Sequence, residues 1–189
     1  MLRIKLYISD NSVKLVEKMV EERAAVLIDN YYLKKEVLDE IENGFKLDYK
    51  AFCDLVCKNH DSSLFRTYVY DCEFKSNEIL LDRLEKLTNF KIRRGEKQKQ
   101  GFHFVQKQVD IQLAVDMITL SKSNIQNIIL ISGDSDFIPA VKYVQDQGTR
   151  VYLWTAKKDK NGELARNCDG ANALTQEVLV SYSTGRHSR

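Results

Sequence analysis

Residues 128–137 read IILISGDSDF, and this stretch decides the fold class. An apolar run of β-branched and leucine residues stops at Ser-Gly, and two aspartates follow one residue apart. Such a run predicts a buried strand of a parallel sheet, and the segment 137–147 behind it has the pattern of a helix. Open α/β sheets bind ligands at the carboxyl ends of their strands, so we expect Asp134 and Asp136 at the functional edge.

The two aspartates of this stretch are open to two interpretations. Neighbouring carboxylates repel each other and are costly to keep ionised unless a cation lies between them, which indicates a Mg²⁺ or Mn²⁺ site. Alternatively, Asp134 is a helix N-cap and Asp136 lies near the positive end of the helix dipole. The stretch by itself favours neither, and the rest of the chain has to decide.

Strand and helix patterns alternate along most of the chain. The expected strands are 24–28, 64–70, 90–93, 128–131 and, last, 151–154. The expected helices are 37–41, 52–56, 78–87, 109–120, 137–147, 163–168 and 171–180. This alternation predicts one α/β domain, residues 24–180, with a parallel sheet sandwiched between helices.

Three segments do not fit this alternation. Residues 94–107 are polar with two glycines and are expected to form a loop. Residues 1–23 form an N-terminal extension, with a strand-like piece at 2–8 and a helical stretch at 13–22, and are open to self-association or a partner contact. Residues 181–189 are expected to be a flexible tail.

Bulk composition restricts the class of protein. The 189 residues suit one domain with a full core and a small extension. The net charge of +2 means that attraction to nucleic acid would have to come from a local patch. No apolar segment approaches the length of a membrane span, no signal peptide is evident, and the four cysteines form no zinc pattern, so we expect a cytoplasmic protein with reduced thiols and no membrane partner.

Acidic residues recur where strands end or helices begin. Asp29 follows the first strand of the domain, and Asp110 lies in the first turn of an apolar helix. If the sheet brings them to Asp134 and Asp136, the four carboxylates form one acidic cluster that needs divalent cations, and its obvious use is phosphoryl transfer. Asp71 also ends a strand, but we expect it at most beside the site.

Three blocks of the sequence resemble a known family. They are AVLID (25–29), KQVDIQLAVD (107–116) and SGDSDF (132–137), and their order, spacing and surroundings match the NYN domains, the LabA-type branch of the PIN-like nuclease superfamily, over roughly residues 24–174. The resemblance implies a PIN-like fold and RNA cleavage that depends on Mg²⁺ or Mn²⁺. It implies that the metal-binding and catalytic acids are Asp29, Asp110, Asp134 and Asp136.

The resemblance also extends to residues around these acids. Asp116 matches an acid of the family pattern whose role is less defined, and Ser132 and Ser135 match the polar residues that flank the last two acids. The family usually has Gly directly after the first Asp and Asn three positions beyond that Asp, where this chain has Asn30 and Tyr32. Either Asn30 supplies the amide from a shifted position, or the site is weakened.

A second departure lies in the middle block. Gln108 replaces a glycine of the family pattern, which removes a flexible residue beside Asp110. Every carboxylate of the pattern is nevertheless in place.

A basic segment leads to Asp110. Between residues 91 and 107 there are six Lys or Arg and one acid, which gives a local charge of +5. Cations beside aromatic residues suit single-stranded nucleic acid, so we expect RNA contacts from Arg93, Arg94, Lys97, Lys99, His103 and Lys107. The alternative is a solvated loop in which Phe102 and Phe104 pack into the core.

Three functions are compatible with these patterns. The first is a metal-dependent endoribonuclease acting on single-stranded or structured RNA, with self-association left open. The second is an RNA-binding or adaptor module with a degenerate metal site, which the changes at Asn30 and Tyr32 favour. The third, a phosphohydrolase of small molecules, leaves the basic segment without a use.

Overall fold

The computed structural model describes residues 5–9, 12–16, 21–41, 45–72, 78–100, 103–107 and 109–182. For residues 5–9, 12–16, 96–100 and 103–107 it describes the backbone only. No helix within these ranges is long and apolar enough to cross a bilayer.

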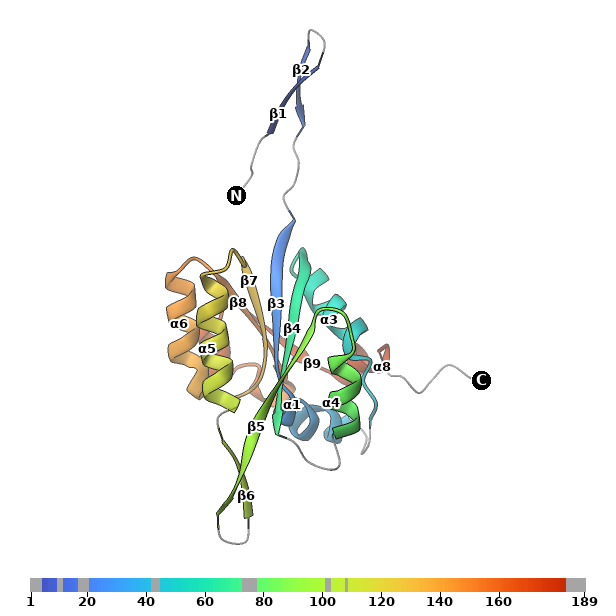
Figure 1. Cartoon of the computed structure of the whole chain (residues 1–189), viewed down its shortest axis with the longest axis vertical. Helices are drawn as coiled ribbons and strands as arrows, with labels where there is room; N and C mark the ends of the chain where they lie inside the picture. Colours follow the sequence, from blue (N-terminus) through green and yellow to red (C-terminus); the bar gives the residue numbers. More distant parts are fainter. Residues whose placement is uncertain are drawn as a thin grey trace, which may run out of the picture.

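A mainly parallel sheet forms the centre of the molecule (Figure 1). Its strand order is β6-β5-β4-β3-β7-β8-β9, and every neighbouring pair is parallel except the edge pair of β5 and β6. The strands are β3 (Glu22–Asp29), β4 (Ser62–Cys72), β5 (Phe90–Gln100), β6 (His103–Lys107), β7 (Asn127–Ile131), β8 (Arg150–Ala156) and β9 (Gly170–Leu174). The predicted α/β class with a parallel sheet is confirmed.

Helices cover both faces of the sheet, as predicted. One face packs against α5 (Val109–Ser121), α6 (Ile138–Asp146) and α7 (Glu163–Asn167). The other packs against the helical segment α1 (Asn30–Tyr32), η1 (Leu33–Leu38) and α2 (Asp39–Ile41), and against α3 (Tyr49–Lys58), α4 (Glu78–Glu85) and α8 (Gln176–Val180). Both faces of β3 are therefore buried, which explains its nearly continuous apolar sequence.

The chain changes direction across the sheet between β3 and β7. From β3 it proceeds outward to β4 and β5, and α5 then returns it to β7, from which β8 and β9 extend to the other side. Neighbouring parallel strands thus lead to connections on opposite sides, which is the position in the topology where open α/β sheets bind ligands. Asp29 and the loop that carries Asp134 lie at this point.

Three segments differ from the sequence-based expectation. The expected loop 94–107 is a hairpin, because β5 continues past Gly95 and pairs with β6, and ladder hydrogen bonds do not require apolar side chains. The start of the expected helix 171–180 is strand β9, which pairs with the free edge of β8; short apolar runs do not distinguish strand from helix. Within the expected helix 13–22 lies strand β2 (Ser12–Val16), which pairs with β1 (Lys5–Ser9).

An ion pair fixes α5 to the sheet. The Arg93 guanidinium on β5 donates to both carboxylate oxygens of Asp116 on α5, each at 2.8 Å. The hydroxyl of Tyr70 on β4 donates to the same carboxylate at 2.9 Å. Since the Asp116 and Arg93 side chains are only 13% and 22% exposed, this bidentate contact is better shielded from water than an ordinary surface pair. It fixes the helix whose first turn carries Asp110.

We therefore expect Asp116→Ala to lower the free energy of unfolding by about 2–3 kcal/mol, because it leaves a half-buried guanidinium and a buried phenol without their acceptor. Urea titration measures the difference. The matched control is Asp54→Ala, which removes the exposed i,i+4 partner of Lys50 and should cost at most about 0.5 kcal/mol. Equal effects of the two substitutions would show that the Asp116 contact does not hold α5 in place.

Candidate metal and active site

Asp29 and Asp134 are oriented by the helices that they begin. Asp29 ends β3, and its Oδ1 accepts a hydrogen bond from the backbone N–H of Tyr32 at 3.0 Å. Asp134 caps η2 (Ser135–Phe137), where its Oδ1 accepts from the backbone N–H of Asp136 at 2.9 Å. The N-cap interpretation of Asp134 is thus realised, and it leaves the second oxygen of each carboxylate for another contact.

Ser132 links the two capping acids. Its side chain is fully buried, and its hydroxyl donates to Asp29 Oδ2 at 3.3 Å and accepts from the backbone N–H of Asp134 at 3.2 Å. Because Ser132 directly follows β7 and Asp29 ends the neighbouring β3, the parallel register of the two strands creates this contact. Ser135, the other flanking serine, is exposed on η2.

The four predicted acids interact through their charges. Burial raises the pKa of Asp29 to about 6, and the charges of Asp110 and Asp134 add to the increase, against the hydrogen bonds from Tyr32 and Ser132. Burial also raises the pKa of Asp110, and Asp134 and Asp136 raise it further. The fold therefore places Asp110 within electrostatic reach of Asp29, Asp134 and Asp136, and Asp134 within reach of Asp29.

The donor set suits a hard divalent cation. All four side chains offer carboxylate oxygens, which Mg²⁺ and Mn²⁺ prefer, and a bound cation would offset the repulsion that contributes to the raised pKa of Asp29 and Asp110. Within the described ranges, no three His, Cys, Asp or Glu side chains converge into a ready-made metal-binding group. Mg²⁺ is commonly held by one or two carboxylates, with water and substrate phosphates completing its shell, so the residues present fit such an ion.

Asn30 and Asp71 belong to a separate buried network. The Asn30 amide donates to Asp71 Oδ2 at 2.6 Å, and its Oδ1 accepts from the Tyr49 hydroxyl at 2.5 Å. Lys34 lies 3.3 Å from the same Asp71 oxygen. The Asn30 amide is therefore used between the sheet and α3, and the expectation that it supplies an amide to the acids from a shifted position does not match this placement.

Tyr32 fills the space beside the acids in place of the asparagine of the family pattern. Its hydroxyl donates to Asp159 at 2.6 Å, lies 2.7 Å from the Thr155 hydroxyl, and accepts from the backbone N–H of Ala156 at 2.9 Å. Its ring lies so close to Gly133 that a Cβ there would meet Tyr32 Cε2 at 2.4 Å. These partners lie more than 100 residues away in the chain, and no local pattern indicates them.

The two predicted RNA-binding residues whose side chains are described are both paired with acids. Arg93 contacts Asp116, and Arg94 contacts Asp82 and Glu85 of α4, each at 2.9 Å. Asp116 is thus a partner of Arg93 and not a fifth member of the acidic cluster. The side chains of Lys97, Lys99, His103 and Lys107, and also of Phe102, Phe104 and Gln108, lie outside the described part of the chain.

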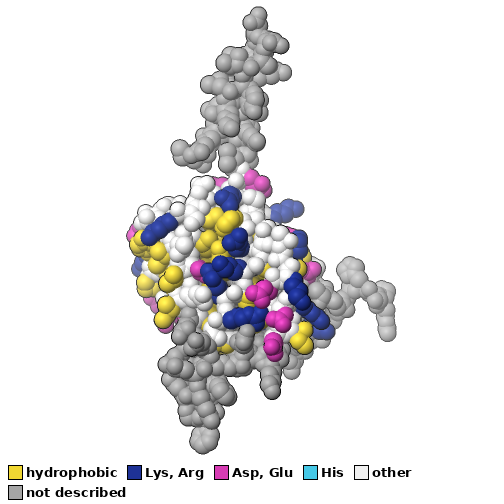
Figure 2. All heavy atoms as spheres, viewed as in Figure 1, with side chains coloured by type: hydrophobic (Ala, Val, Ile, Leu, Met, Phe, Trp, Pro, Cys, Tyr) yellow, Lys and Arg dark blue, Asp and Glu magenta, His cyan; other side chains and the backbone are white. Residues whose placement is uncertain are grey.

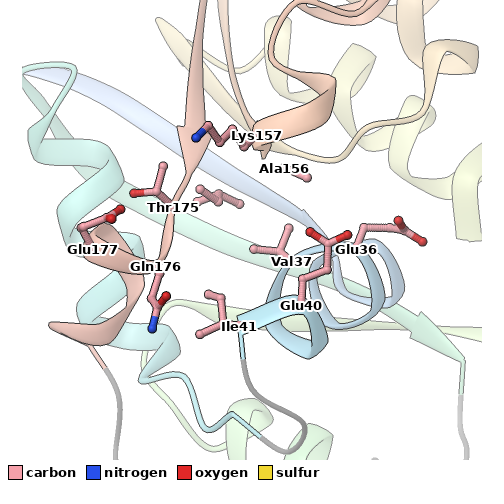
Figure 3. Close-up of a pocket in the computed structure, with 10 residues that line it drawn as sticks. Glu36, Val37, Glu40, Ile41, Ala156, Lys157, Thr175, Gln176 and Glu177 are labelled. Atoms are coloured by element: carbon pink, nitrogen blue, oxygen red, sulfur yellow. The ribbon is translucent and has the colours of Figure 1, made fainter.

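A hollow of about 270 Å³ lies elsewhere, at the carboxyl ends of β8 and β9 (Figure 3). It is lined by Glu36, Val37, Glu40, Ile41, Ala156, Lys157, Leu174, Thr175, Gln176 and Glu177. Three of these residues are glutamates and one is a lysine, so its net charge is unsuitable for a phosphate. None of the four acids lines this hollow.

The electrostatic strain at Asp29 predicts a pH-dependent stability. Because its pKa rises from 3.8 in the unfolded chain to about 6 in the fold, the metal-free protein loses stability as pH rises through this interval. Asp29→Asn keeps the cap and removes the charge, so we expect it to stabilise the metal-free protein by up to about 3 kcal/mol at pH 8 and hardly at all at pH 4. Urea titrations in EDTA at both pH values, with Asp54→Asn as an exposed control, test this, and a loss of stability at pH 8 would contradict it.

The contact between Gly133 and Tyr32 predicts a coupled pair of substitutions. We expect Gly133→Ala to destabilise the fold by about 1–3 kcal/mol, because the new methyl group has to displace the Tyr32 ring. In the Tyr32→Ala background the same change should cost much less. A double-mutant cycle by thermal unfolding measures the coupling, and strict additivity would contradict the contact.

Comparisons with known proteins agree with this arrangement. The family model described as the NYN domain matches residues 23–175. The structure is similar to the crystal structure of a protein of unknown function from Vibrio parahaemolyticus, with a TM-score of 0.68 and 16% identity over 87% of this chain and 99% of that chain, a similarity that shows the fold alone. No curated protein matches the chain. With its sheet order, its acids at the switch point and the family match over most of its length, this chain belongs to the NYN domain family, a family of PIN-like nucleases.

Proposed function

We propose that this protein is a Mg²⁺- or Mn²⁺-dependent ribonuclease that cleaves RNA internally. The observation that carries the proposal is the grouping of Asp29, Asp110 and Asp134 in an NYN domain, where the charges of Asp110 and Asp134 raise the pKa of the half-buried Asp29 at a cost to stability. Structural carboxylates are instead usually paired, as Asp116 is with Arg93. Carboxylates whose pKa is raised by burial and by neighbouring acids, as those of Asp29 and Asp110 are, are typical of a functional site.

The four acids would have two different roles, holding the metal ion and facing the phosphate. Asp29 and Asp134 are held by backbone N–H groups and by Ser132, so they would form the fixed part of a metal-binding site. Asp110 and Asp136 are exposed at helix starts and would face the scissile phosphate. A divalent cation, when bound, supplies Lewis acidity for the phosphodiester and the attacking water.

The proposal does not require a catalytic histidine. Of the three histidines, His60 is stacked on Tyr152 with ring centroids 3.9 Å apart, and its Nε2 accepts a hydrogen bond from the Trp154 indole at 3.3 Å. Burial lowers the pKa of His60, which keeps the ring neutral in this aromatic contact. His60 thus packs against β8, and none of its contacts described above is with the four acids.

The decisive variant is Asp136→Asn. The Asp136 carboxylate is exposed and its backbone N–H, not its side chain, serves the cap, so folding should be unaffected. We expect cleavage of a labelled single-stranded RNA in Mn²⁺ to fall by at least about 100-fold, because a ligand or phosphate-side acid is lost. Gel analysis of the products with time gives the rate, and EDTA should abolish cleavage by the unaltered protein.

Two comparisons make this experiment specific. Asp54→Asn removes an exposed carboxylate of α3 and should leave the rate unchanged. RNA binding that persists in EDTA without any turnover in Mn²⁺ would instead favour the adaptor function, in which the site with Tyr32 has lost catalysis. Cleavage by Asp136→Asn and Asp134→Asn at the unaltered rate would remove the proposed mechanism.

A further inference from the structure

Part of one face of the sheet is not covered by a helix and carries cations and aromatic rings. Figure 2 shows Lys and Arg side chains alternating with hydrophobic ones along the middle of this face, over β3, β4 and β5. The residues are Arg23, Phe65, Arg66, Tyr68, Lys91 and Arg93, which we call the basic sheet face. Four of them, Arg23, Phe65, Arg66 and Tyr68, were not indicated by any sequence pattern as candidates for RNA binding.

A bulge in β4 creates this arrangement. Ala24 pairs with Leu64 but Ala25 pairs with Arg66, so Phe65 is the extra residue between them. Such an insertion shifts the alternation by one position, and Phe65 and Arg66 then lie on the same side of the sheet. Phe65 and Tyr68 both pack against the core beneath α5 and α6, which identifies that side.

The cations of the face lie over its rings. The Arg23 and Arg66 guanidinium groups lie 4.4 and 5.2 Å from the centre of the Phe65 ring, and Arg93 lies 5.6 Å from that of Tyr68. Within the described ranges, no carboxylate forms an ion pair with Arg23, Arg66 or Lys91, whereas Arg93 is paired with Asp116. Three cations of the face are thus available to an external anion.

We propose that the basic sheet face binds single-stranded RNA and directs it to the acidic cluster, an inference that rests on the proposed function. Guanidinium groups next to the partly exposed Phe65 ring provide phosphate contacts and a stacking surface together, which is what single strands require, whereas the Tyr68 ring is buried. The face lies on the side of the sheet that carries α5 and hence Asp110. Arg23 and Asp29 lie six residues apart on β3, or about 20 Å at about 3.3 Å per residue, and this is the distance that the bound RNA has to span. Residues 24–28 between them are buried, so the contact surface is provided by the partly or fully exposed side chains of β4 and β5.

The test measures binding without cleavage. A fluorescein-labelled single-stranded 20-nucleotide RNA is titrated in EDTA, by anisotropy, over a series of KCl concentrations. For Arg66→Ala/Lys91→Ala we expect at least tenfold weaker binding at 100 mM KCl and a slope of log Kobs against log[KCl] smaller by about 1.4, since each lost phosphate contact contributes about 0.7. Phe65→Leu should weaken binding about fivefold or more with the slope unchanged, because only stacking is lost.

The control removes the same charge elsewhere. Lys58→Ala/Lys142→Ala eliminates two exposed cations, on α3 and α6, and should leave affinity and slope unchanged. Thermal unfolding of every variant verifies the fold. Equal weakening by both double variants, no weakening by either, or no RNA binding by the unaltered protein would overturn the inference.

The outcome is independent of the nuclease assay. If Asp136→Asn keeps full activity while Arg66→Ala/Lys91→Ala loses binding, the catalytic proposal fails and the basic sheet face remains. If Asp136→Asn abolishes cleavage while the face variants bind normally, the nuclease proposal remains and RNA reaches the acids by another route.

Discussion

Repulsion between carboxylates at the ends of β3 and β7 is the constraint on which the site depends. The parallel register places Ile28 beside Ile131, so Asp29 and Ser132, the next residues of the two strands, come into contact. Partial burial raises the pKa of Asp29, and the charges of Asp110 and Asp134 raise it further. The charge of Asp29 lowers stability, so its presence is better explained by function than by folding. A bound cation and a polyanionic substrate would account for it.

The charges around this site fall into two groups. Asp116 and Asp71 are each satisfied by cations and hydrogen bonds, so they act as structural links between helices and sheet. The acids of the site interact mainly with backbone N–H groups, Ser132 and one another. The cations also fall into two groups. Arg93 and Arg94 form ion pairs with acids, while Arg66 and Lys91 face outward from the sheet.

Features set by local sequence could be predicted, and features set by distant contacts could not. The apolar runs at 24–28 and 128–131 predict the central strands, and the aspartates that follow them predict the edge at which the site lies. The roles of Asp116 and Arg93 depend on the packing of α5 against β5, which spacing along the chain does not encode. Strand β9 and the β5–β6 hairpin exist because partner edges are present, and the bulge at Phe65 appears only in the pairing of β3 with β4.

The change at Tyr32 shows how the site tolerates a departure from its family pattern. Gly133 provides the space for the Tyr32 ring, and Thr155, Asp159 and the Ala156 backbone satisfy its hydroxyl. The backbone N–H of Tyr32 still donates to Asp29 Oδ1, so the substitution leaves the carboxylate oriented. Only the side chain differs at position 32, and the hydrogen bond that orients Asp29 comes from the backbone N–H of that residue. Loss of the family asparagine therefore does not imply loss of the acidic cluster.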